Sequence, residues 1–177
     1  MPEQRIRKHE WQLQTRESGY TAVVAIVQRT VQAPPDKVFA VLADGWTYSD
    51  WVVGTAHIRD VDPAWPAPGS KVHHKAGPWP FSLKDSSTVV SMTPDRELTL
   101  MAGLWPLGEA RVRILLEPEG AGTRVIMKED FEAGPLLAVR NKINDLILHR
   151  RNVESLRRLS DIATRSSVDG AVRGVDG

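Results

Sequence analysis

The sequence predicts an α+β domain in which a curved antiparallel sheet of about seven strands wraps around one long C-terminal helix. The helix is predicted because residues 135–164 contain no glycine and no further proline, and carry apolar residues at three- and four-residue steps. The sheet is predicted because residues 20–131 contain short strand patterns separated by turn residues, and such strands pair antiparallel with their neighbours. Two short helices are expected after the first strand.

Composition narrows the protein class before any motif is considered. The chain has 177 residues, of which 41% are hydrophobic, and this is enough for one domain with a sizeable core. A formal net charge of +1 gives no reason to expect nucleic-acid binding, and the absence of cysteine excludes disulfides and thiol catalysis. No apolar run approaches a membrane span or a signal peptide. We therefore expect a cytoplasmic protein without stable membrane insertion.

Three segments are expected along the chain. Residues 1–18 are polar and charged and form an N-terminal arm, residues 19–164 form the folded domain, and the small, polar residues 165–177 form a disordered tail. The role of the arm and the oligomeric state are left open.

The elements of the domain follow from local patterns. Residues 20–31 are rich in Val, Ile and Thr and predict the first strand. Pro35 and Asp36 open a short helix, because proline is tolerated in the first helical turn, and a second short helix or turn is predicted at residues 46–53. Further strands are predicted at residues 55–61, 71–76, 81–92, 97–101, 107–117 and 123–131.

The last hairpin shows the clearest alternation. Val112, Ile114 and Leu116 share one face of its first strand, and the intervening residues include arginines. On the second strand, Val125 and Met127 share a face. One side of the hairpin is therefore predicted to be buried and the other to be exposed to solvent.

The long helix, predicted from Pro135 to about Thr164, needs a partner of similar length. At about 1.5 Å per residue it spans roughly 43 Å, and only the sheet is long enough to cover it. Its predicted buried stripe consists of Val139, Ile143, Leu146, Val153 and Leu156.

Three motifs in the right order resemble a known family. They are residues 33–42 (APPDKVFAVL) followed by tryptophan at 46 and 51, residues 116–125 (LEPEGAGTRV), and residues 151–159 (RNVESLRRL). Together they resemble the START-like superfamily, within it the SRPBCC group of polyketide cyclase/dehydrase and lipid-transport proteins, over residues 20–164. The resemblance implies a helix-grip fold with a cavity between sheet and helix. The family includes lipid binders, cyclases, hydroxylase domains and protein-binding modules, so the fold alone does not give the function.

Aromatic residues are the first candidates for contacting a ligand. The chain has six tryptophans and only two tyrosines, and most of the tryptophans fall in loops or at element ends. Large rings at a cavity mouth can bury much apolar ligand surface, although such rings can equally complete a small core. The set is Trp46, Trp51, Trp65, Trp79, Phe81 and Trp105.

Polar residues on the predicted inward faces of strands are the second candidates. Glu129 lies on the same strand face as Val125 and Met127, Asp85 lies on the same face as Val89, and His74 lies on the same face as Val72. A buried carboxylate must find a partner or shift its pKa. We expect Arg150 on the helix to pair with Glu129 or Asp85, as a structural ion pair or as part of a site.

No cofactor or metal is expected. Adjacent strand residues point to opposite faces, so His73 and His74 cannot both enter one cavity, and no metal-binding histidine spacing is present. The sequence also lacks a phosphate loop, a dinucleotide fingerprint and a nucleophile elbow.

The basic residues of the long helix have two interpretations. Arg150, Arg151, Arg157 and Arg158 could contact an anionic partner. The alternative, which we favour, is a solvated face with pairs such as Glu154–Arg157 and Glu154–Arg158.

The sequence therefore predicts a domain that binds a small hydrophobic molecule, such as a lipid, polyketide or isoprenoid. We expect Trp51, Trp79 and Trp105 to gate the cavity, Phe81 and Leu146 to line it, and Glu129 with Arg150 to supply polarity. One alternative is a polyketide aromatase/cyclase or dehydratase that uses His74, Asp85 or Glu129 as acid or base. The other is a protein-interaction module with a vestigial cavity. Between binding and catalysis we favour binding.

Overall fold

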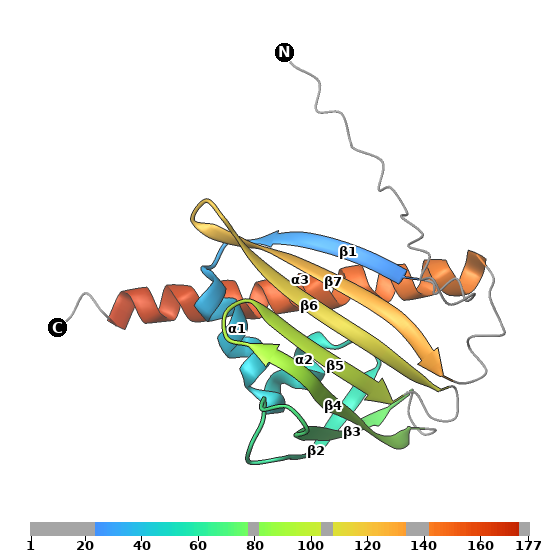
Figure 1. The fold of residues 1–177 in the computed structure, drawn as a ribbon. Coiled ribbons are helices and arrows are strands. Elements are labelled where there is room, and N and C mark those ends of the chain that lie inside the picture. The colour runs from blue at the N-terminus through green and yellow to red at the C-terminus, as the bar shows by residue number, and fades with distance from the viewer. Residues whose placement is uncertain (1–23, 78–81, 104–107, 134–141, 174–177) are drawn as a thin grey trace.

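The computed structural model describes residues 24–77, 82–103, 108–133 and 142–173, and these form one antiparallel sheet with a long helix along one face (Figure 1). This confirms the predicted α+β helix-grip architecture. The elements follow in the order β1 (Val24–Val31), α1 (Pro35–Ala43), η1 (Gly45–Thr47), α2 (Tyr48–Trp51), β2 (Thr55–Val61), β3 (Lys71–Ala76), β4 (Leu83–Thr93), β5 (Glu97–Gly103), β6 (Glu109–Glu119), β7 (Gly122–Ala133) and α3 (Lys142–Arg173).

The sheet has seven strands in the order β1-β7-β6-β5-β4-β3-β2. From β2 to β7 each strand pairs with the next one in the chain, and β1 returns to pair with β7. β1 and β2 are therefore the two edges of the sheet. The segment between them, which holds α1 and α2, must cross from one edge to the other, and this places both short helices against α3.

The short helices form where the sequence predicts them. Pro35 begins α1, Asp36 places a negative charge near the helix N-terminus, and the face built on Val38 and Leu42 is buried. The helix ends at Ala43, and the side chain of the next residue, Asp44, accepts a hydrogen bond from Trp46 N at 3.0 Å and so caps the following 3-10 turn.

The turn between β6 and β7 is tighter than the sequence predicts. The strands continue to Glu119 and Gly122, whereas the pattern predicted a loop over residues 118–122. Gly120 has a φ of 60°, and a Cβ at Gly122 would overlap the carbonyl oxygen of Val31. Glycine at both positions therefore permits the short turn and its close approach to the end of β1.

The buried face of α3 differs from the predicted stripe. Leu156 is buried as expected, but Leu146 and Val153 are 47% and 44% exposed. Asn152 and Ser155 are buried in their place, so the helix presents to the sheet a different face from the one that hydropathy alone selects. Among the α3 residues whose burial is described, 146–167, the buried ones are Leu148, Asn152, Ser155, Leu156, Leu159, Ser160 and Ala163.

Helix α3 also ends later than predicted. The sequence predicts that the helix ends at about Thr164, whereas α3 continues to Arg173. No proline interrupts this stretch, and the hydroxyls of Ser166 and Ser167 donate to carbonyl oxygens of the preceding turn. The start predicted at Pro135, together with the arm 1–18 and the beginning of the first strand, lies outside the described residues. No helix within the described ranges is long and apolar enough to cross a membrane.

Thr123→Val is expected to lower the free energy of unfolding by about 1–3 kcal/mol. The fully buried Thr123 Oγ1 donates a hydrogen bond to the Ala33 carbonyl oxygen at 2.7 Å, and valine would leave this carbonyl oxygen without its donor. Urea unfolding measures the change. Thr30→Val is the matched control, since Thr30 Oγ1 donates to Glu119 in an exposed position. Equal effects of the two substitutions would contradict the assignment.

Candidate functional site

A cavity of about 420 Å³ lies between the sheet, α2 and α3. Its volume falls within the range of small-molecule sites in proteins. Its described lining comes from α2 and the turn after it, from β2–β7 and from α3: Tyr48, Trp51, Val52, Val53, Gly54, Thr55, His74, Ala76, Gly77, Leu83, Asp85, Ser87, Leu100, Ala102, Gly103, Val112, Met127, Glu129, Arg151, Asn152 and Ser155.

A buried ion pair joins α3 to β7 in this cavity. Glu129 is only 1% exposed, and both its carboxylate oxygens accept hydrogen bonds from Arg151 Nη2. Asn152 Nδ2 donates to the same carboxylate at 2.7 Å. The strand alternation that buries Met127 also turns Glu129 inward, as predicted, and consecutive residues of α3 supply its donors.

The predicted partner of Glu129 was wrong by one residue. Arg150 is exposed, whereas the side chain of Arg151 is 28% exposed and reaches Glu129. The error follows from the predicted stripe: a buried face through Leu146 and Val153 places Arg150 inward, and the actual face through Leu148 and Asn152 places Arg151 inward.

A hydrogen-bonded chain of three buried side chains forms another part of the wall. The Tyr48 hydroxyl lies 2.8 Å from Ser87 Oγ, which lies 3.3 Å from His74 Nε2. Burial raises the pKa of Tyr48 to about 12, and the hydrogen bond to Ser87 only partly opposes this. Burial likewise lowers the pKa of His74, against the opposing effect of Asp85. Near neutral pH, both groups are uncharged.

Aromatic rings pack around Tyr48. Its ring centroid lies 5.6 Å from that of His74 in a stacked arrangement and 5.4 Å from that of Trp51 in an edge-on arrangement. Trp51, a predicted ligand contact, is 2% exposed and lines the cavity from α2. Trp65 also packs edge-on against Tyr48 and donates from Nε1 to the Leu42 carbonyl, while Trp46 is 60% exposed.

Two buried nitrogens of the cavity wall have no hydrogen-bond partner within the described structure. They are Trp51 Nε1 and His74 Nδ1. Buried polar groups are rarely left unpaired in folded proteins, because each costs free energy of desolvation. Both atoms lack accessible surface, so they are enclosed within the wall and are not open to the free volume of the cavity.

Asp85 lies beside His74 on the neighbouring strand. The two residues are register partners across β3 and β4, and Asp85 Oδ1 accepts a hydrogen bond from the Ser86 backbone N–H at 2.8 Å. A Cβ at Gly103 would overlap the Asp85 carboxylate. Glycine at this position therefore leaves the space that the carboxylate occupies at the cavity wall.

The remaining predicted ligand contacts have different outcomes. Leu146, expected to line the cavity, is 47% exposed and is not among the cavity residues. Its position follows from the same difference in the buried face of α3. Trp79, Phe81 and Trp105 lie outside the described residues.

Sequence reasoning missed several cavity residues. Ser87 has the same strand parity as Asp85 and lies between it and Val89, so the alternation itself was the available signal. Asn152 lies four residues from both Leu148 and Leu156, which places it on their face of the helix. Tyr48 had no such signal, because the orientation of a one-turn helix depends on its tertiary contacts.

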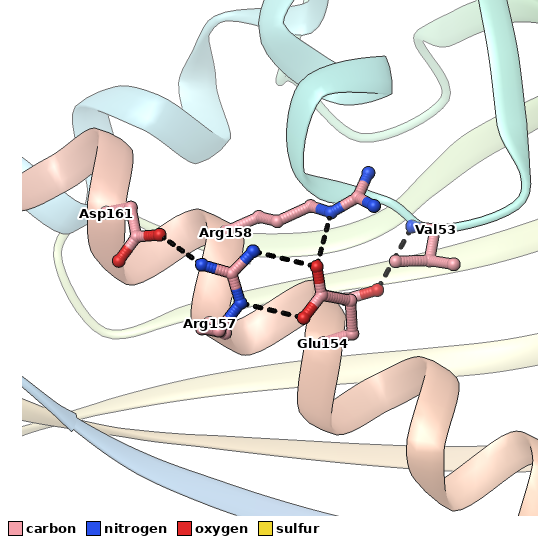
Figure 2. A network of polar contacts seen from close by, with 6 residues as sticks. Val53, Glu154, Arg157, Arg158 and Asp161 are labelled. Atoms are coloured by element: carbon pink, nitrogen blue, oxygen red, sulfur yellow. Dashed lines mark hydrogen bonds and ion pairs between the residues drawn. The ribbon is translucent and has the colours of Figure 1, made fainter.

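The basic face of α3 is largely paired. Figure 2 shows Arg157 and Arg158 converging on Glu154, with Arg157 also reaching Asp161. The predicted Glu154–Arg157 and Glu154–Arg158 pairs are confirmed, and these hydrogen bonds, Arg157 first, lower the pKa of Glu154 to about 2. A surface hollow of about 480 Å³ lies beside these arginines. Arg157, Arg158 and Asp161 in its lining already take part in these ion pairs, and we do not assign a site to it.

Beside this network, a hydrogen bond joins the turn after α2 to α3. The Val53 backbone N–H donates to Ser155 Oγ at 3.1 Å (Figure 2). Both residues line the cavity, so this bond closes the wall between α2 and α3.

No three His, Asp or Glu side chains are grouped as metal ligands in the part of the chain that the structure describes. His74 faces the cavity, whereas His73 faces away from it and lies 3.3 Å from Asp62. The two adjacent histidines thus occupy opposite faces of β3.

Arg151→Met is expected to destabilise the fold by about 3 kcal/mol, because it leaves the buried Glu129 carboxylate without its cationic partner. Urea unfolding measures this loss. Arg150→Met, the matched control on the exposed neighbour, should change stability by less than about 0.5 kcal/mol. Glu129→Gln combined with Arg151→Met should recover part of the loss; an effect of Arg150→Met as large as that of Arg151→Met would contradict the pairing.

Stability should also depend on the titration of His74. Its folded pKa lies below the ordinary 6.5, so its contribution is fully present above pH 6.5 and is lost as the pH falls towards the folded pKa, because the unfolded chain binds the proton first. Urea unfolding at about pH 7.5 and about pH 5.5 measures this. His74→Gln should reduce the loss between the two pH values, and an unchanged slope would refute the assignment.

Comparison with known proteins agrees with this fold. The family described as "Polyketide cyclase / dehydrase and lipid transport" matches residues 23–162, while no curated protein matches the sequence. The fold is similar to that of Ara h 8.0201 (TM-score 0.64, 12% identity, 80% of this chain and 97% of that one). It is also similar to the Zhui aromatase/cyclase from Streptomyces sp. R1128 (TM-score 0.62, 19% identity, 81% of this chain and 94% of that one). A third similar structure is TTHA0849 from Thermus thermophilus (TM-score 0.61, 18% identity, 81% of this chain and 99% of that one). At these identities the structures share the fold alone. The family match spans most of the chain, which therefore belongs to the polyketide cyclase/dehydrase and lipid-transport family.

Proposed function

We propose that this protein binds a small hydrophobic molecule, such as a lipid, polyketide or isoprenoid, in the cavity between α3 and the sheet. The observation that carries the proposal is the unfilled volume of about 420 Å³, lined mainly by apolar side chains and backbone. A vestigial cavity would be closed by its own side chains. The volume therefore weighs against the interaction module.

The cavity wall has the composition that such binding requires. Trp51, Leu100, Val112 and Met127 offer apolar surface from four different elements. Apolar burial contributes roughly 25 cal/mol per Å², less the cost of association, and a few polar groups orient the ligand. Here Glu129 and the Tyr48–Ser87–His74 chain are those groups.

Native mass spectrometry of the purified protein, followed by organic extraction, tests the proposal. A stoichiometric hydrophobic molecule is expected, or, for an empty protein, a thermal shift with members of a hydrophobic panel. A clean apo mass without any thermal shift would count against binding.

Ala102→Phe should abolish this binding, because Ala102 lines the cavity and a phenyl ring would occupy its volume. Met101→Phe is the control, since the neighbouring residue of β5 points to the other face of the sheet. The same mass spectrometry and thermal-shift measurements report both variants. Retained binding in Ala102→Phe would place the ligand elsewhere.

A second candidate function is that of a polyketide aromatase/cyclase or dehydratase. Its supporting observation is the neutral, buried imidazole of His74 at the cavity wall beside Asp85, a combination suited to general acid–base catalysis. Incubation with a linear poly-β-ketone thioester tests it. Cyclised or dehydrated product that disappears with His74→Gln would favour the enzyme, and binding without turnover would favour the carrier.

A further inference from the structure

The N-terminal part of α3 carries an apolar patch on the side that faces away from the sheet. Leu146, Ile147 and Val153 are exposed, and so is Arg150, which lies three or four residues from each of them. Residues at these spacings are neighbours on a helix surface, so the four form one outer patch. Single exposed apolar residues need no explanation, but three on one side of a helix do.

The same turns of α3 are also buried on the opposite side. Residues two positions apart on a helix lie roughly 160° apart around its axis. Leu148 and Asn152, which are buried, therefore lie opposite Arg150. Beyond the outer patch, the exposed side of the helix carries the ion pairs of Arg157. A helix segment that is apolar on two sides is typical of one that is covered on both.

The chain enters the described fold at the level of the outer patch. Ala25, near the start of β1, is the register partner of Glu129, and Glu129 accepts hydrogen bonds from Arg151 of α3. β1 also packs against α3, and its first residues are drawn beside the N-terminal part of the helix in Figure 1. The residues that precede Val24 are therefore attached close to the outer patch.

The N-terminal arm, residues 1–18, has the composition and the length to cover this patch. Trp11 and Leu13 are two residues apart, so they share one side of an extended segment, and Glu10 supplies a negative charge beside them. Leu13 precedes Val24 by 11 residues, which reach about 36 Å when extended. An α-helix with its side chains is only about 10 Å across, so this reach is sufficient to pass over α3.

A second copy of the chain fits the outer patch less well. A stable dimer buries about 800 Å² on each partner, over about 20 residues or more, whereas the patch consists of four residues. A two-fold axis through the patch would also bring Arg150 towards the same residue of the other copy, and the two charges would repel. Arg150 has no ion-pair partner among the described residues.

We propose that the N-terminal arm docks on the outer patch of α3 in the same chain. Trp11 and Leu13 supply the apolar contact, and Glu10 lies next to Arg150. The arm then holds from outside the turns of α3 that Glu129 holds from inside. This inference does not depend on the proposed binding function.

Paramagnetic broadening in the full-length protein tests the docking. The chain has no cysteine, so Gln12→Cys gives a single attachment point for a nitroxide label, on the opposite side of an extended segment from Trp11 and Leu13. The amide signals of residues 146–153 are expected to be lost, and to return when the nitroxide is reduced. Signals that stay unchanged would overturn the proposal.

Variants of the labelled protein test which side chains are responsible. Trp11→Ser combined with Leu13→Ser should restore the amide signals of α3, and so should Ile147→Ser. Val90→Ser is the matched control, because Val90 is an exposed apolar residue on β4, and it should leave the broadening intact. Equal broadening with and without the two serines in the arm would refute docking through these residues.

A mixed sample distinguishes the arm of the same chain from that of another copy. It contains isotope-labelled protein without cysteine and nitroxide-labelled protein without isotope. Unchanged signals of residues 146–153 in this sample are expected. Broadening there would assign the outer patch to a second copy and overturn the proposal. Each outcome leaves the binding of hydrophobic molecules in the cavity to its own test.

Discussion

The buried carboxylate of Glu129 constrains how the helix meets the sheet. A carboxylate that is 1% exposed is costly unless its charge is compensated, and its donors come from two consecutive residues of α3. Arg151 and Asn152 can reach Glu129 only at one rotation and one axial position of the helix. Hydrophobic packing of Leu156, Leu159 and Ala163 further along α3 is less directional and would tolerate other settings.

This arrangement divides the helix–sheet interface into two parts. Towards its C-terminal half, α3 packs closely on the core with small and aliphatic residues. At Arg151, Asn152 and Ser155 the interface becomes polar, and the cavity opens beside these residues. The ion pair holds the helix in place where side chains do not fill the interior.

The sequence predicted the strands and short helices closely because their signals are local. β2 and β3 have the predicted bounds, and the alternation of the β6–β7 hairpin correctly placed Glu129 in the interior. The partner and lining residues on α3 were harder to predict. Hydropathy favours Leu146 over Asn152 as the buried residue, although Asn152 has helical spacing from the buried Leu148 and Leu156. Periodicity therefore offers two faces of α3, and the choice between them depends on Glu129 in the strand that the helix faces.

The position of β1 in the sheet has a consequence for how the chain folds. Val24 at the start of β1 pairs with Asp130, and Val31 with Thr123, so the edge next to α3 forms only from segments at opposite ends of the domain. Strands β2 to β7 can pair sequentially as they leave the ribosome, but β1 remains without its partner until almost the whole sheet has been synthesised. Contacts of such large sequence separation slow folding, because the intervening chain must be ordered before they form. The edge formed by β1 and β7 and the helix that lies beside it therefore depend on the contacts of greatest sequence separation in the domain, and α3 supplies one wall of the cavity.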